Sequence, residues 1–372
     1  MAVAFYDNKL EIADILNFSF AELHELLCSP DIIDGASVRD FEADIRDWTG
    51  AQHAIAVNNA TDGLMIALAA AGIGPGDEVI VPCYSFFATA SSVVHVGAMP
   101  VFVDIDPQTY ALDIDKIQRA ITQRTKAIMP VHLFSQMADM PKLTKLAHEH
   151  GLLVVEDSAE AMGMYQYDQH AGTIGDIGVF SFFPTKTLGA LGDAGMIITQ
   201  NVSLAEKCRA IANLRDGQAH AGHFRILSRM DDWQAIVLRQ RLNRLDGTIG
   251  ARNANARRLT QLLSLVKGVQ TPVFVDKGYG SSAVYYVYLI EAERRDELAA
   301  YLARHHVAAE TYYPLALHLQ PVFRQLGYVE GDFPHAERAS KRALGLPMHP
   351  ELKEPDVQEI ARLIGAFYGD NP

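Results

Sequence analysis

The sequence is poor in cysteine, in basic residues and in long apolar runs. Only three of its 372 residues are cysteine, and so small and unpatterned a set disfavours both a disulfide framework and a zinc site. Lysine and arginine number 32 against 45 aspartates and glutamates, which gives a net charge of −13. That charge disfavours nucleic acids and anionic membranes as partners. No apolar run approaches the roughly 20 residues of a membrane span, and residues 1–14 show no signal segment. We therefore expect a cytoplasmic protein without a metal site.

What the chain does contain is enough apolar sequence for a large core, 49% of its residues. Short apolar runs alternate with helical patterns from residue 53 onward, which predicts an α/β fold. Several of the runs are continuously apolar, as in a mostly parallel seven-stranded sheet covered by helices on both faces. The strands are expected at His53–Val57, Glu78–Pro82, Met99–Val103, Lys126–Val131, Leu152–Glu156, Ile177–Phe182 and Gly195–Thr199.

A change of character near residues 268–272 indicates a second, smaller domain. We expect a large domain at residues 1–250, which begins with a helical segment, and a C-terminal α+β domain at residues 251–372. A long helix predicted from Asp231 to about Val266 would connect the two. Further strands are expected at Val284–Ile290 and Ala308–Thr311.

One lysine, Lys186, lies among small and apolar residues in a glycine-rich turn just after the sixth predicted strand. Most lysines are solvated, so a surface position is the commoner explanation for a single lysine. Burial would lower the pKa of the ammonium group, and a neutral amine is a nucleophile that can form a Schiff base. Gly189, Gly192 and Gly195 would let the chain turn tightly and re-enter the sheet.

Other chemistry-bearing residues follow the carboxyl ends of neighbouring strands, where parallel sheets bind ligands. Ala60 and Thr61 open a helix, whose free N–H groups can hold a phosphate. Aromatic residues at 84–87 could stack on a flat ring, and Asp157 ends a buried strand. Each has an ordinary explanation alone, as a helix cap or as core packing. Together with Lys186 they are the parts that would hold pyridoxal phosphate.

The chain from about Val38 onward resembles the DegT/DnrJ/EryC1/StrS sugar aminotransferases, which are fold-type I pyridoxal-phosphate enzymes. The lysine segment and the acidic segment are the most specific matches. The matching segments are Asn59–Asp62, Gly74–Val79, Val131–Phe134 with Gln136, Glu156–Ala161, Gly175–Gly178, Ser181–Lys186, Leu317–Pro321 and Leu346–Leu352.

The resemblance assigns roles to individual residues. It implies that Lys186 forms the Schiff base, that Asp157 pairs with the pyridine nitrogen and that Glu160 lies near the ring hydroxyl. It also implies a homodimer with shared active sites, and glutamate as the usual amino donor. Phe86 matches the aromatic that stacks on the cofactor, and the phosphate-binding positions are those of Ala60, Thr61 and Ser181.

One segment departs from the family pattern. Many relatives supply an asparagine to the neighbouring subunit's phosphate, and Leu227 occupies that position here. Ser228 or Arg229 could replace it, or one subunit could hold the phosphate alone. Arg225 could bind a phosphate on the acceptor or be a surface residue. His318 could contact the substrate or be structural.

The resulting hypothesis is a ping-pong aminotransferase that moves an amino group from glutamate to a keto group on a nucleotide-linked deoxysugar. Amination of a ketocyclitol is an alternative that no residue separates from it. A pyridoxamine-dependent sugar dehydratase is disfavoured, because relatives of that kind replace the lysine found here at Lys186. A non-catalytic regulator that binds pyridoxal phosphate is a further alternative.

Overall fold

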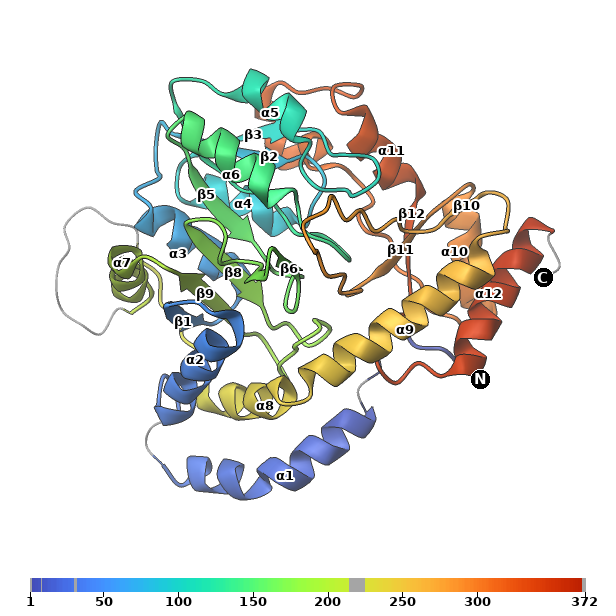
Figure 1. The fold of residues 1–372 in the computed structure, drawn as a ribbon, viewed down its shortest axis with the longest axis horizontal. Helices are drawn as coiled ribbons and strands as arrows, with labels where there is room; N and C mark the ends of the chain where they lie inside the picture. Colours follow the sequence, from blue (N-terminus) through green and yellow to red (C-terminus); the bar gives the residue numbers. More distant parts are fainter. Residues whose placement is uncertain (1, 8, 30–31, 214–224, 370–372) are drawn as a thin grey trace.

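A seven-stranded sheet lies at the centre of the large domain (Figure 1). The computed structural model describes residues 2–7, 9–29, 32–213 and 225–369. The strands lie in the order β1-β9-β8-β5-β4-β2-β3, and β9 runs antiparallel to both of its neighbours while the other pairs are parallel. The predicted mostly parallel sheet is therefore confirmed. The strands are β1 (His53–Val57), β2 (Glu78–Pro82), β3 (Met99–Val103), β4 (Thr125–Ile128), β5 (Leu153–Asp157), β8 (Ile177–Ser181) and β9 (Gly195–Thr199).

Helices cover both faces of this sheet because successive strand residues point to opposite sides. Ile55 and Val57 pack into one core with α3 (Ala60–Ala70), α4 (Phe87–His95) and α7 (Val202–Ala212). Ala54 and Ala56 face the other side. That side is covered by α2 (Ala36–Thr49), α5 (Ile114–Ala120), α6 (Met140–Glu149) and α8 (Asp232–Leu242).

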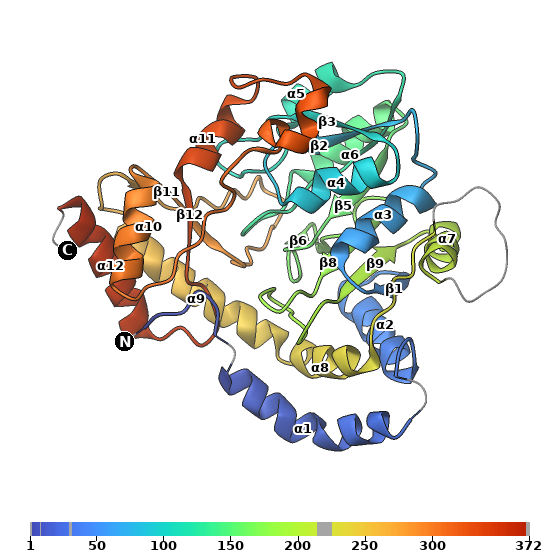
Figure 2. The same ribbon diagram turned by 180° about the vertical axis from the view of Figure 1, so that it is seen from behind.

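The C-terminal part forms a smaller layer around a three-stranded antiparallel sheet (Figure 2). This sheet contains β10 (Val269–Gln270), β11 (Tyr288–Ala292) and β12 (Ala343–Leu346). Its helices are α9 (Leu245–Leu263), α10 (Arg295–Arg304), α11 (Pro334–Arg342) and α12 (Glu354–Tyr368). The chain start joins it, because Val3 pairs with Val307. The proposed boundary at residue 250 falls inside α9 and stays a prediction.

Two local predictions were wrong. The single long helix from Asp231 is two helices, α8 and α9, which are separated by a turn at Asn243 and Arg244. The strand expected at Ala308–Thr311 is not regular. Within the described residues, that segment forms a single isolated bridge, between Glu310 and Gly345.

The remaining elements lie at the periphery. α1 (Lys9–Leu27) runs along α8 (Figure 1). β6 (Tyr165–Gln166) and β7 (Gln169–His170) form a small hairpin, and two 3₁₀ helices span Leu317–Leu319 and Pro321–Leu326.

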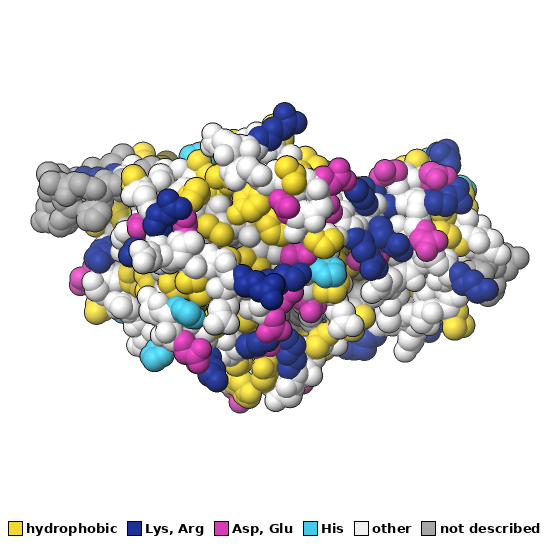
Figure 3. All heavy atoms as spheres, turned by 90° about the horizontal axis from the view of Figure 1, so that it is seen from above, with side chains coloured by type: hydrophobic (Ala, Val, Ile, Leu, Met, Phe, Trp, Pro, Cys, Tyr) yellow, Lys and Arg dark blue, Asp and Glu magenta, His cyan; other side chains and the backbone are white. Residues whose placement is uncertain are grey.

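Basic and acidic side chains are interspersed on the face shown in Figure 3. Among the described residues, no helix is both long and apolar enough to cross a membrane.

Gly195 allows the start of α3 to lie directly against the sheet. A Cβ at this position would lie 2.7 Å from the carbonyl carbon of Asn59 and 2.9 Å from the nitrogen of Ala60. Because both are backbone atoms, Gly195→Ala is expected to lower the free energy of unfolding by about 1–3 kcal/mol. Urea denaturation measures this. Gly250→Ala is the control, since a Cβ in that open position of α9 meets nothing within 4 Å and is expected to stabilise by about 0.5–1 kcal/mol. Equal effects of the two changes would contradict the packing explanation.

Candidate active site

Lys186 is held in the turn between β8 and β9. Its backbone N–H donates to the carbonyl of Phe183 at 2.8 Å, and the N–H of Ala190 returns to the carbonyl of Phe182 at 2.7 Å. Gly189 is needed for space, since a Cβ there would lie 2.4 Å from the carbonyl oxygen of Pro184. Its φ is not in the left-handed region, and neither are those of Gly192 and Gly195. Close packing, and not an unusual backbone angle, therefore explains these glycines.

The amino group of Lys186 is enclosed by an acid and an aromatic ring. Its Nζ lies 3.2 Å from Oε1 of Glu160 and 4.2 Å from the centre of the Tyr286 ring. The side chain is only 14% exposed. Burial lowers the pKa of the Lys186 ammonium, but Glu160 and Tyr286 outweigh that effect, and the net direction is upward. The expectation of a lowered pKa for Lys186 is therefore wrong for the described residues.

Asp157 ends β5 with its carboxylate buried and bonded on both oxygens. Oδ2 accepts from Oγ1 of Thr89 at 2.8 Å, and Oδ1 accepts from the N–H of Ala159 at 3.3 Å. Ser85 continues the chain of hydroxyls, with its Oγ 2.8 Å from that of Thr89. Burial raises the pKa of Asp157, while Thr89, Ala159 and the charge of Lys186 oppose the rise. The carboxylate is thus oriented and partly protected from protonation.

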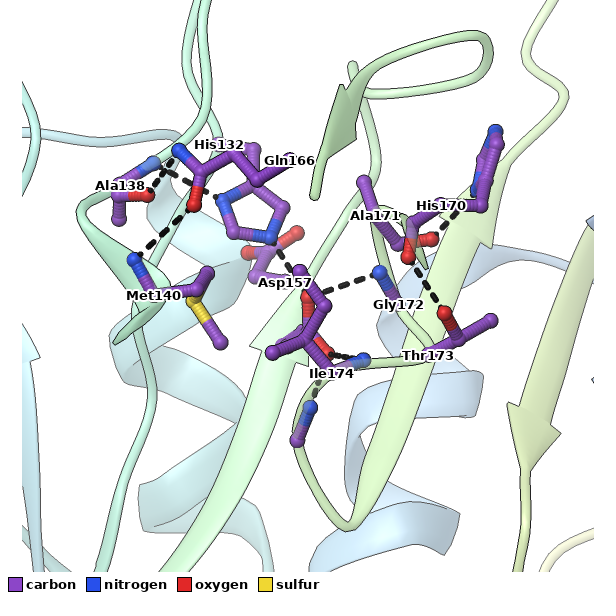
Figure 4. Close-up of polar contacts among 12 residues, drawn as sticks. His132, Ala138, Met140, Asp157, Gln166, His170, Ala171, Gly172, Thr173 and Ile174 are labelled. Atoms are coloured by element: carbon purple, nitrogen blue, oxygen red, sulfur yellow. Dashed lines mark hydrogen bonds and ion pairs between the residues drawn. The ribbon is translucent and has the colours of Figure 1, made fainter. Parts of the chain in front are cut away.

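A buried network beside Asp157 fixes the strand end (Figure 4). The Glu156 carboxylate accepts N–H groups of Gly172 at 2.7 Å and Ile174 at 2.8 Å, together with Nε2 of His132 at 2.8 Å. Nδ1 of His132 accepts from the N–H of Ala138 at 3.2 Å, so the ring proton is on Nε2. The backbone N–H of His132 also donates to the carbonyl of Asp157 at 3.1 Å. Glu156 therefore ties the loop before β8 to the strand that carries Asp157.

The N-terminus of α3 provides an anion site at the same edge of the sheet. Asn59 caps the helix by accepting from the N–H of Asp62 at 2.8 Å. In the described part of the chain, no hydrogen bond uses the N–H groups of Ala60 and Thr61, which is usual for the first helical turn. Ser181 pairs with Gly195, and Gly195 in turn lies against this helix start. The three residues predicted to hold a phosphate are thus brought to one corner.

The segment around Leu227, which departs from the family pattern, also contacts the start of α3. The Ser228 hydroxyl donates to Oδ2 of Asp62 at 2.7 Å and accepts from the N–H of Asn58 at 3.0 Å, so it braces the helix start. In Arg229, Nε and Nη1 are buried and have no hydrogen-bond partner among the described residues. Leu227 is 52% exposed.

The other predicted site residues lie in distinct surroundings. Phe86 is 60% exposed at the start of α4, with its ring 6.3 Å from that of Tyr313. Nη2 of Arg225 donates to the carbonyl of Asn213 at 2.8 Å. His318 is buried, and its Nε2 lies 3.1 Å from the Glu337 carboxylate. Neither Arg225 nor His318 makes a described contact with Lys186 or Asp157, and their roles in substrate binding stay predictions.

Thr89 and Tyr286 have no recognisable signal in the sequence, and Phe134 lies in a family motif that does not show its role. Thr89 is one of three hydroxyl residues on α4, beside Ser91 and Ser92, and only its burial and its hydrogen bond to Asp157 show its role. Tyr286 lies in a run of tyrosines that resembles ordinary core. Phe134 has a left-handed backbone, with φ at 63°, and its N–H donates to Oε2 of Glu160 at 2.8 Å.

Thr89→Val should raise the pKa of Asp157, because it removes a hydrogen bond to the charged form. Binding of a ligand that needs the ionised carboxylate weakens as pH falls through this pKa, so its acid midpoint should move to higher pH. At neutral pH we expect binding of pyridoxal phosphate to weaken by about 10-fold, the scale of one hydrogen bond to a charged group. Spectroscopic titration against pH measures both effects. Thr144→Val is the control, since that hydroxyl bonds only to carbonyls of its own helix. An acid midpoint that stays in place would contradict this role.

Residues 14–364 match the model of the DegT/DnrJ/EryC1/StrS aminotransferase family. The chain belongs to this family. The resemblance inferred from the motifs is thereby confirmed, and with it the classification as a pyridoxal-phosphate-dependent aminotransferase. The match covers the lysine turn, Asp157 and the start of α3.

Individual relatives span nearly the whole chain. A protein of Geobacillus stearothermophilus named as a pleiotropic regulatory protein is 47% identical, over 93% of each chain. A UDP-N-acetyl-3-dehydro-alpha-D-glucosamine 3-aminotransferase of Acidithiobacillus ferrooxidans is 39% identical, over 98% of this chain and 97% of the relative. The crystal structure of S. venezuelae DesV in complex with a ketimine intermediate superposes with a TM-score of 0.94 at 34% identity, over 100% of both chains. The predicted fold class is confirmed.

The residues present fit pyridoxal phosphate. Its aldehyde requires an amine, which Lys186 would supply, and its pyridine nitrogen requires a carboxylate, which would be that of Asp157, held in place by Thr89. Its phosphate requires N–H donors without other partners, which the first turn of α3 provides. The described residues of one chain thus include a donor group for each part of this cofactor.

Proposed function

We propose that the protein transfers an amino group to a keto group of a nucleotide-linked sugar, with glutamate as the amino donor in a ping-pong reaction. The observation that carries this proposal is the convergence of Lys186, Glu160 and Asp157 at one edge of the sheet. The substrate class is supported by the relative of Acidithiobacillus ferrooxidans, whose name specifies a UDP-linked dehydro sugar.

The chain's own groups would divide the work among themselves. When bound, pyridoxal phosphate supplies an aldehyde that reacts with amines and a ring that withdraws electrons from the reacting carbon. Nζ of Lys186 would hold the aldehyde and, as a free amine, would carry a proton to or from the substrate carbon. The Asp157 carboxylate would hold a proton on the ring nitrogen. Glu160 holds the Lys186 ammonium, so this carboxylate must give up its contact before the amine can react.

A second group of residues would bind the phosphate of the cofactor. Ala60, Thr61 and Ser181 would bind the phosphate oxygens, while Ser228 braces the helix start through Asp62. The two guanidinium nitrogens of Arg229 without described partners could be satisfied by the same anion. Phe86 is exposed and would stack on the ring.

The proposal extends to the assembly. An exposed Leu227 in the segment where relatives cross to a neighbouring subunit supports a homodimer with shared active sites. A cytoplasmic location is also part of the proposal. It rests on the charge, and on three cysteines that are free, two of them buried.

The decisive experiment gives the protein glutamate and a panel of UDP- and dTDP-linked keto sugars together with ketocyclitols, and identifies products by mass. We expect an amino sugar nucleotide and 2-oxoglutarate in equal amounts. An aminated cyclitol alone would replace the substrate assignment. A protein that binds the cofactor but makes no 2-oxoglutarate would instead be a regulator, as the name of the Geobacillus relative suggests for that protein.

A further inference from the structure

Tyr286 is the one aromatic ring described over the amino group of Lys186, and nothing in the family motifs points to it. The lysine Nζ lies 4.2 Å from the ring centre, on the scale of a cation–π contact. The side chain of Tyr286 is buried, and its hydroxyl lies 3.2 Å from Oγ1 of Thr185, the residue before the lysine. The ring is thus anchored to the turn that carries the reacting amine.

The backbone of Tyr286 is fixed from both sides. Its N–H donates to the carbonyl of Phe134 at 3.0 Å, and its carbonyl accepts from Nη1 of Arg252 on α9 at 3.2 Å. Phe134 has a left-handed backbone, which is uncommon for a non-glycine residue. Its N–H donates to Glu160 while its carbonyl accepts from Tyr286. One residue therefore sets the positions of both groups that enclose the amine.

We propose that Tyr286 is a positioning residue which, together with Glu160, forms a holding site for the free Lys186 amine. The carboxylate neutralises the ammonium and the ring face covers it, so the amine stays at a fixed place whenever it is not bound to the cofactor. Tyr286 precedes β11, and Lys186 follows β8. The holding site therefore forms only when the small C-terminal sheet is correctly seated on the large domain.

The holding site should affect the protonation of Lys186. The titratable groups that face the amine are Glu160, Asp157 and Tyr286, with Tyr312 and Tyr313 beside Glu160 and the Tyr286 ring. A cation held over a ring is stabilised relative to the neutral amine, so removal of the ring should lower the pKa of Lys186. In this proposal the ring face acts on the amine, and the hydroxyl anchors the ring to Thr185.

The test measures the reaction of Lys186 with acetic anhydride as a function of pH, with quantification of the labelled peptide by mass spectrometry. It uses the full-length chain, first without cofactor and then loaded with pyridoxamine phosphate, which leaves the lysine amine free. For Tyr286→Leu we expect the labelling midpoint to fall by about one pH unit. For Tyr286→Phe we expect it to stay within about 0.3 unit, because the ring is kept.

Controls separate positioning from general damage. Tyr285→Leu removes the neighbouring ring, which packs against Tyr288 instead of the lysine, and its midpoint should match the wild type. Glu160→Gln should lower the midpoint, because it removes the countercharge. If Tyr286→Leu leaves the midpoint of the cofactor-free chain unchanged, or if Tyr286→Phe lowers it as much as leucine does, the holding site is overturned.

This inference rests on Lys186 being the reacting amine of the proposed function, yet the two fail differently. Labelling needs neither a sugar nor an amino donor. Failure of the proposed function would appear as a wild-type protein that transfers no amino group. Failure of the holding site would appear as an unchanged labelling midpoint in an active enzyme.

Discussion

Replacing Lys186 by alanine is expected to lower kcat/KM for amino transfer by at least about 10³-fold. In the proposed function, the change removes both the amine that would hold the cofactor and the group that would carry the proton, and general acid–base catalysis alone contributes about 10²–10⁴-fold. The amine is enclosed by Glu160 and Tyr286, so no solvent-exposed lysine can replace it in that position. Steady-state kinetics with glutamate and the identified keto sugar measure the loss.

Two controls accompany this change. Lys207→Ala alters an exposed lysine on α7 and should keep wild-type kinetics. A small added amine such as methylamine should partly restore the activity of Lys186→Ala, because it can carry the proton in the space that the side chain leaves. Turnover by Lys186→Ala at the wild-type rate would refute the assigned role.

Asp157→Asn is expected to lower kcat/KM by about 10²–10⁴-fold while the protein still binds pyridoxal phosphate. Asparagine has nearly the same shape and can accept the Thr89 hydrogen bond, but it has no charge to keep a proton on the ring nitrogen. The loss should therefore fall on kcat more than on KM for the keto substrate, because the chemistry depends on the ring's electron withdrawal.

Asp115→Asn is the matched control, because that carboxylate is exposed and pairs only with Lys142. Its kinetics should equal those of the wild type. If Asp157→Asn kept its kcat and only weakened cofactor binding, the carboxylate would serve to anchor the ring and not to hold its proton.

The sheet was predictable because its strands are short, mostly apolar runs bounded by turn residues. The seven expected strands all form, with shifts of a few residues at their ends. The same reasoning placed Lys186 and Asp157 at one edge, since ligands collect at the carboxyl ends of parallel strands. The break between α8 and α9 at Asn243 was missed because its flanking residues are good helix formers, and tertiary packing determines where the helices separate.

The surroundings of Lys186 could not be predicted. Tyr286 comes from a segment 100 positions further along the chain, and only the seating of the small sheet brings its ring to the amine. The pKa of Lys186 was expected to fall because burial was foreseen, but the Glu160 carboxylate at 3.2 Å reverses the direction. His318 lies in a family motif, yet its burial against Glu337 depends on tertiary packing that spacing does not reveal.

The most direct test of the site is to load the protein with pyridoxal phosphate, reduce it with borohydride and map the modified peptide by mass spectrometry. Lys186 as the cofactor lysine predicts one added cofactor mass per chain, located on Lys186, and none in the Lys186→Ala protein. A cofactor mass on another lysine, or no modification of the wild-type chain, would contradict it.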